Sequence, residues 1–130
     1  MRAMHVVVVG IAAVAMSCGG SSSGITNPAP PAGGVNIVIQ DFKFSPAVDT
    51  IKVGTTVQWV NDGPSEHSTT SDIGLWNSQG LTPPSGMNTY SAANGTFSFT
   101  FTQAGTYTYH CMFHTPAAYP NFVGTIVVTN

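Results

Sequence analysis

Apolar and polar residues alternate along most of the sequence after the first 34 residues, and this period of two restricts the fold more than any other feature. The clearest run is 97–102, where three Phe alternate with Ser and Thr, and similar runs occupy 35–39 and 106–111. Successive side chains of a β-strand point to opposite faces, whereas a helix would show a period of about 3.6 residues. Turn signals such as Asn94-Gly95 separate the runs. We therefore predict an all-β fold, a β-sandwich of short strands.

Charged residues are scarce, which argues against several classes of function. They make up 6% of the 130 residues, against about a quarter in an average domain. Three Lys plus Arg form no basic face, so we expect no nucleic-acid partner. Five scattered Asp plus Glu argue against a paired-carboxylate hydrolase and a calcium cage, and two Cys cannot form a disulfide framework. From Ile73 to Asn130 the chain has no Lys, Arg, Asp or Glu.

The first 17 residues have the pattern of an export signal. Arg2 provides the positive start, and the apolar run over 6–16 is too short for a transmembrane helix, which needs about 20 residues. Small residues precede Cys18 and a Gly/Ser tract follows it, as in bacterial lipoproteins. We predict a lipoprotein-type signal peptide over 1–17 and lipidation of Cys18. Ordinary cleavage near Ala15 or Ser17 is the alternative.

The segment that follows is predicted to be a linker rather than part of a core. After Cys18, residues 19–34 are Gly, Ser, Pro, Ala, Thr and Asn with a single Ile. Such a composition buries little apolar surface and behaves as a flexible chain. We therefore predict a flexible stalk over 18–34 that joins the anchor to one folded domain over 35–130.

Three side chains near the predicted strand ends have metal-binding chemistry. Cys111 and His114 are three residues apart where a predicted strand runs into a loop. A second imidazole, that of His67, follows a turn after the strand that ends near Val60. Two His and one Cys are the donor set of a trigonal type 1 copper site.

The domain resembles the cupredoxin family of blue copper proteins, of the plastocyanin, pseudoazurin and amicyanin kind. The resemblance covers about residues 35–130 and rests on segments 42–46, 53–61, 95–101, 105–111 and 123–128. It implies a Greek-key β-sandwich of seven or eight strands with one type 1 copper ion at one end. It also implies that His67, Cys111 and His114 are the equatorial ligands of that ion.

The sequence departs from the family pattern at the axial position. The family usually has Met two residues before a Gly at the start of the last strand, and here Phe122 stands two residues before Gly124. We expect a three-coordinate copper with Phe122 or Tyr119 as apolar cover, not as ligands. Met87 and Met112 are the alternative axial donors.

The sequence leads to three further expectations, for His110, for Ser68 and for residues 71–93. His110 lies on the strand face opposite Cys111, so we expect it not to bind the metal. Ser68 is expected to join the two ligand loops by a hydrogen bond, as the resemblance implies. Residues 71–93 contain Pro83-Pro84 and no clear period, which predicts a long irregular surface segment.

The function we predict is electron transfer rather than catalysis. The protein is expected to be exported, periplasmic or at the cell surface, and to touch the membrane only through a lipid anchor. It is expected to act as a monomer that carries single electrons between redox proteins, which dock weakly and transiently on its uncharged half. The alternative is a non-redox copper carrier or storage module, which the missing axial Met and the long loop after His114 leave open.

Overall fold

The computed structural model describes residues 32–84 and 95–130, and strands dominate both ranges. Eight strands form within these ranges, and no helix is present there. The strands are β1 Val35–Gln40, β2 Lys43–Ser45, β3 Val48–Lys52, β4 Thr56–Asn61, β5 Thr70–Ser71, β6 Thr96–Thr100, β7 Gly105–His110 and β8 Val123–Thr129.

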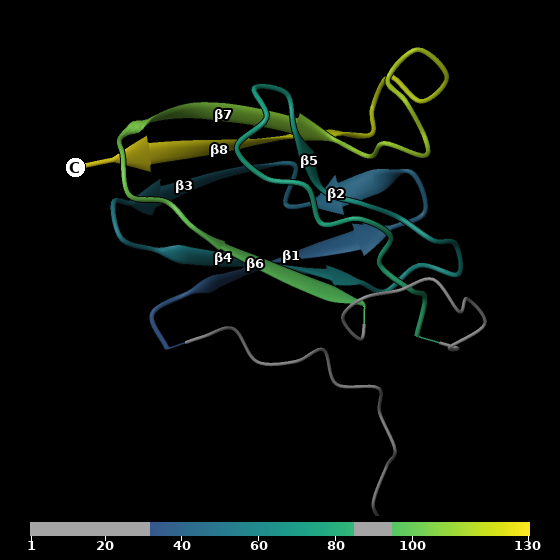
Figure 1. Cartoon of the computed structure of the whole chain (residues 1–130), viewed down its shortest axis with the longest axis horizontal. Helices are drawn as coiled ribbons and strands as arrows, with labels where there is room; N and C mark the ends of the chain where they lie inside the picture. The colour runs from purple at the N-terminus through teal and green to yellow at the C-terminus, as the bar shows by residue number, and fades with distance from the viewer. Residues whose placement is uncertain (1–31, 85–94) are drawn as a thin grey trace, which may run out of the picture.

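The strands form two four-stranded sheets, with the orders β2-β1-β4-β6 and β3-β8-β7-β5. Figure 1 shows β3, β7 and β8 in one layer and β1, β4 and β6 in the other. One pair in each sheet is parallel, β1 with β4 and β3 with β8, and the remaining pairs are antiparallel. The predicted all-β sandwich of seven or eight strands is confirmed.

The apolar side chains of the alternating strands fill the space between the two sheets. In β7, Tyr109 is fully buried whereas Thr106 and Thr108 are exposed, as the period of two predicts. Trp59 of β4 is also fully buried, and its ring centroid lies 5.5 Å from that of Tyr109 and 5.5 Å from that of Trp76. These contacts join β4 of one sheet to β7 of the other across the core.

The segment predicted as a surface excursion, 71–93, is in part a core segment. Residues 85–94 lie outside the described part of the chain, but 72–84 turn back on the strands. Leu81 forms an isolated bridge with His67, and Trp76 and Leu81 are buried in the core. The segment is irregular and 72–75 are exposed, as predicted. The prediction of a surface excursion was wrong for the part that follows, because Trp76 and Leu81 anchor it in the core.

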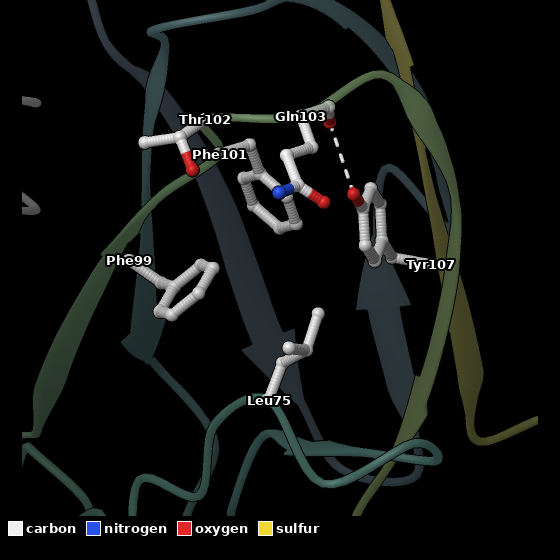
Figure 2. A pocket seen from close by; sticks show the side chains of 6 residues that line it. All are labelled: Leu75, Phe99, Phe101, Thr102, Gln103 and Tyr107. Atoms are coloured by element: carbon white, nitrogen blue, oxygen red, sulfur yellow. Dashed lines mark hydrogen bonds between the residues drawn. The ribbon is translucent and has the colours of Figure 1, made fainter.

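A small open pocket lies at the end of the sandwich where β7 begins (Figure 2). Its lining residues are Leu75, Phe99, Phe101, Thr102, Gln103 and Tyr107. The hydroxyl of Tyr107 donates to the carbonyl of Gln103 at 3.0 Å, and this contact borders one side of the pocket. Since Cys111 follows the other end of β7, this pocket is remote from the predicted ligands.

The predicted signal peptide over 1–17, the lipidation site Cys18 and most of the stalk over 18–34 lie outside the described residues. Across residues 32–84 and 95–130 there is no helix with the length and apolar character to cross a membrane.

A close contact between β7 and β8 leads to the first prediction. Gly124 pairs with Tyr109, and a methyl group on Gly124 would collide with the Tyr109 ring. Gly124→Ala should therefore lower the free energy of unfolding by about 1–3 kcal/mol, as overpacking does. Urea unfolding of the purified protein measures the change.

Gly105→Ala is the matched control for this substitution. It lies at the exposed start of β7, where the nearest atom to an added methyl group would be the Tyr107 hydroxyl, at 3.3 Å. A Gly124→Ala protein as stable as the Gly105→Ala protein would contradict the close approach.

Candidate metal centre

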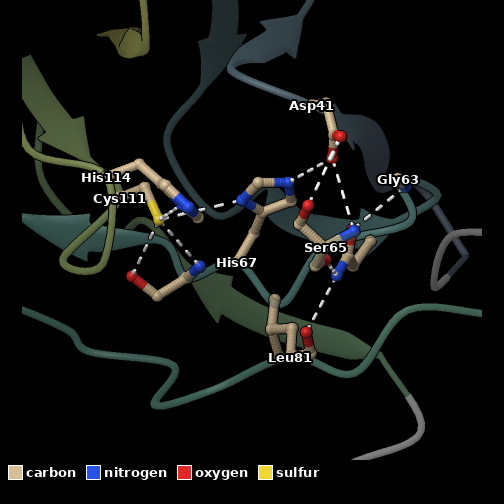
Figure 3. Close-up of polar contacts among 9 residues, drawn as sticks. Asp41, Gly63, Ser65, His67, Leu81, Cys111 and His114 are labelled. Carbon is tan, nitrogen blue, oxygen red and sulfur yellow. Dashed lines mark hydrogen bonds and ion pairs between the residues drawn. The ribbon is translucent and has the colours of Figure 1, made fainter. Parts of the chain in front are cut away.

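The structure brings His67, Cys111 and His114 together at one end of the sandwich (Figure 3). One donor atom from each residue lies within 4.8 Å of the other two. Cys111 Sγ lies 4.0 Å from His67 Nδ1 and 3.7 Å from His114 Nδ1. A metal–sulfur and a metal–nitrogen bond together span about 4.4 Å, so one ion can reach each pair.

Local structure explains how the two C-terminal donors reach this point. Cys111 follows the last residue of β7 and continues its inward face, so its thiol is fully buried beyond Tyr109. The chain then leaves the sheet, and His114 lies three residues later at the surface, where it is only half-buried. The two donors therefore differ in access: the thiol is closed to solvent, whereas His114 is partly exposed.

His67 is positioned by the loop that follows β4. The buried amide of Asn61 donates to the carbonyls of Ser65 and Leu81, at 2.8 Å each, and accepts from the backbone N–H of Gly63 at 3.1 Å. His67 in turn exchanges two backbone hydrogen bonds with Leu81, at 3.3 and 2.8 Å. These bonds hold the fully buried His67 in a fixed loop rather than a mobile one.

Ser68 joins the two ligand loops, as expected from the sequence. Its backbone N–H donates to Cys111 Sγ at 3.3 Å, and its hydroxyl accepts from the backbone N–H of Met112 at 2.8 Å. The two loops are 43 residues apart in sequence at this contact. Their separation is thus set by hydrogen bonds that do not need a metal.

Sequence reasoning missed Asp41, whose carboxylate lies 3.0 Å from His67 Nε2. Burial lowers the pKa of His67, and the bond to Asp41 only partly opposes this. For Asp41, burial raises the pKa, but hydrogen bonds from His67 and Ser65 outweigh it and hold the pKa below its usual value. The imidazole is therefore neutral and the carboxylate ionised near neutral pH, which leaves His67 Nδ1 able to bind a cation.

Aromatic rings enclose the donor cluster. Phe122 is fully buried, and its ring centroid lies 5.0 Å from that of His67 and 6.2 Å from that of His114. Tyr119 lies 5.3 Å from His114 and stacks on Phe42 at 4.3 Å. Phe42 is a second residue that the sequence did not single out for the site.

The remaining candidates lie away from the cluster or outside the described residues. Met112 is 41% exposed, and Met87 falls in the segment that the structure does not describe. His110 is not in the donor cluster, and its Nδ1 pairs with the Asp72 carboxylate at 2.6 Å on the outer face of β7. This agrees with the expectation that His110 faces away from Cys111.

The comparisons with known proteins agree with this geometry. The family model for copper-binding proteins of the plastocyanin/azurin family matches residues 32–129. Amicyanin from Paracoccus denitrificans is 33% identical to this chain over 96 residues. These residues make up 74% of this chain and 66% of amicyanin, so the match spans just under two thirds of that relative.

Solved cupredoxin structures have the same fold. A purple cupredoxin from Nitrosopumilus maritimus is 28% identical with a TM-score of 0.56, over 73% of this chain and 99% of that one. An oxidized methionine-to-leucine mutant of amicyanin is 25% identical with a TM-score of 0.59, over 78% of this chain and 86% of that one. The chain therefore belongs to the plastocyanin/azurin family of copper-binding proteins, the cupredoxins.

Proposed function

We propose that this protein carries single electrons on one type 1 copper ion held by His67, Cys111 and His114. The observation that supports the proposal most directly is the convergence of one thiol and two imidazoles within 4.8 Å in a chain of a copper-binding family. This donor set is that of a type 1 copper site, whose chemistry is the exchange of one electron between Cu(I) and Cu(II).

The protein's own residues would keep the site nearly unchanged during that exchange. Cys111 and His67 are fully buried, and Ser68 fixes the spacing of their loops by hydrogen bonds. Phe122 closes the site beside both imidazoles, so water has little access there. When the donor atoms are fixed and water has little access, a change of charge at the site needs little reorganisation energy.

The surface around His114 fits weak and transient docking of redox proteins. His114 is half-buried, and its neighbours Met112 and Phe113 are 41% and 47% exposed. No Lys, Arg, Asp or Glu occurs from Ile73 to Asn130. We propose that electrons enter and leave through this apolar surface, and that the protein acts as a monomeric carrier rather than as an enzyme.

The location of the protein is also a proposal. The apolar run over 6–16, Cys18 and the Gly/Ser-rich stalk support export and lipid anchoring at the periplasmic or outer face of a membrane. The stalk would let the copper domain reach partners near that membrane.

Copper loading tests the proposed function. Purified protein given Cu(II) should develop an intense visible band from thiolate-to-copper charge transfer, and the band should disappear on reduction and return on reoxidation. Cys111→Ser should abolish the band, whereas Cys18→Ser should retain it, since the chain has only these two Cys. Copper binding without a reversible band would support the non-redox carrier instead.

A substitution at Phe122 tests the axial side of the site. Phe122→Met should add a weak thioether donor, and because a donor stabilises Cu(II) more than Cu(I), the reduction potential should fall. Phe122→Leu is the matched control, since it is apolar without a donor atom and should leave the potential near that of the wild type. Voltammetry of the three proteins decides the matter, and an equal potential in the Met and Leu variants would show that Phe122 is not axial.

The lipid anchor has its own test. Cys18→Ser should move the protein from the membrane fraction to the soluble fraction of its host, because the modified residue is lost. Mass spectrometry of the wild-type N-terminus is the direct check. An unmodified N-terminus created by cleavage near Ala15 or Ser17 would refute the anchor without affecting the copper proposal.

A further inference from the structure

The residue that contacts the far side of His67 is Asp41, in the turn between β1 and β2. His67 Nδ1 lies on the side of Cys111 Sγ, and His67 Nε2 lies 3.0 Å from Asp41 Oδ1 (Figure 3). An ionised carboxylate only accepts hydrogen bonds, so it favours the neutral imidazole with its proton on Nε2. That tautomer is the one whose Nδ1 has a free lone pair for a metal.

The Asp41 carboxylate is itself held in place by the loop that carries His67. Ser65 donates to it twice, from the backbone N–H at 3.4 Å to Oδ1 and from the hydroxyl at 3.3 Å to Oδ2. Gly63 permits this approach, because a Cβ there would lie 2.8 Å from Asp41 Oδ1 and 3.0 Å from the Asp41 backbone nitrogen. The backbone N–H of Asp62 also donates to the Ile39 carbonyl at 2.8 Å. The turn and the ligand loop therefore form one connected unit.

The backbone of the turn is itself unusual. Gln40 pairs with Lys43, so Asp41 and Phe42 make a two-residue connection, and Phe42 has φ 61°. This left-handed conformation favours Gly or Asn and is unfavourable for a bulky residue. Here it places the Phe42 ring 5.1 Å from that of His114, while Asp41 meets His67. Such strain commonly accompanies functional sites, and in this turn consecutive residues contact both imidazoles.

We propose that Asp41 is a positioning residue of the copper centre, which fixes the tautomer and orientation of His67 and adds a negative charge behind that ligand. The proposal rests on the proposed function. The charge makes the imidazole a stronger donor and so favours Cu(II) over Cu(I). The hydrogen bond and the charge are separable, because an Asn amide oxygen accepts the same bond without the charge.

Two substitutions separate these effects. Asp41→Ala removes the bond and the charge, so the fraction of His67 that is protonated on Nε2 should fall, and the affinity for Cu(II) should fall by about tenfold or more, the usual effect of losing such a partner. Asp41→Asn should keep the tautomer and raise the reduction potential. Nitrogen NMR of the metal-free protein at about pH 8, above the ordinary pKa of His, reports the tautomer. Copper competition and voltammetry report affinity and potential.

Asp72→Ala is the matched control, since Asp72 also pairs with a His nitrogen, that of His110, which lies outside the donor cluster. It should leave the His67 tautomer, the copper affinity and the potential unchanged. The proposal is overturned if Asp41→Ala lowers thermal stability alone and matches Asp72→Ala in tautomer and affinity. If the wild type shows no reversible copper band, the proposed function fails, whereas the tautomer comparison still tests the role of Asp41 because it needs no metal.

Discussion

The contact between Ser68 and Cys111 is the interaction on which the metal end of this structure depends. Ser68 lies in the segment between β4 and β5, and Cys111 directly follows β7, the strand that pairs with β5. The backbone N–H of Ser68 bonds to the thiol, and its hydroxyl receives the N–H of Met112. Because His67 directly precedes Ser68, this link also sets the distance between the first imidazole and the sulfur. The packing of Trp59 on Tyr109 brings the two sheets together behind it.

The two imidazoles then have different surroundings, and this asymmetry fits a carrier of electrons. His67 is buried, held by Leu81 and Asp41, and belongs to the rigid interior. His114 is only half-buried and packs against the stacked rings of Phe42 and Tyr119. In the proposed copper site, His67 would maintain the geometry while His114 would give access to the ion. The stretch that carries His114, from Ile73 to Asn130, has no Lys, Arg, Asp or Glu, which would suit the weak and transient docking proposed above.

Much of this could be predicted from the sequence, because the signals are local. The period of two predicts which face of each strand is buried, as for Tyr109. Cys111 and His114 are three residues apart, at a point where a predicted strand runs into a loop. Asp41 and Phe42 could not be found in this way. Their contacts with the ligands depend on the parallel pairing of β1 with β4, which places Ile39 beside Asn61. Trp76 was expected to be a packing residue, and it is buried. The path of the irregular segment around it could not be predicted for a similar reason, since no period shows that this segment turns back into the core.

We propose that copper is bound by one thiolate and two imidazoles, with an aromatic ring in place of an axial thioether. X-ray absorption of the copper-loaded wild-type protein tests it most directly, because sulfur and nitrogen neighbours scatter differently. We expect one short copper–sulfur distance and two imidazole nitrogens, with no second sulfur. A copper ion surrounded only by nitrogen and oxygen would contradict the role of Cys111, and a second sulfur would contradict the place given to Phe122.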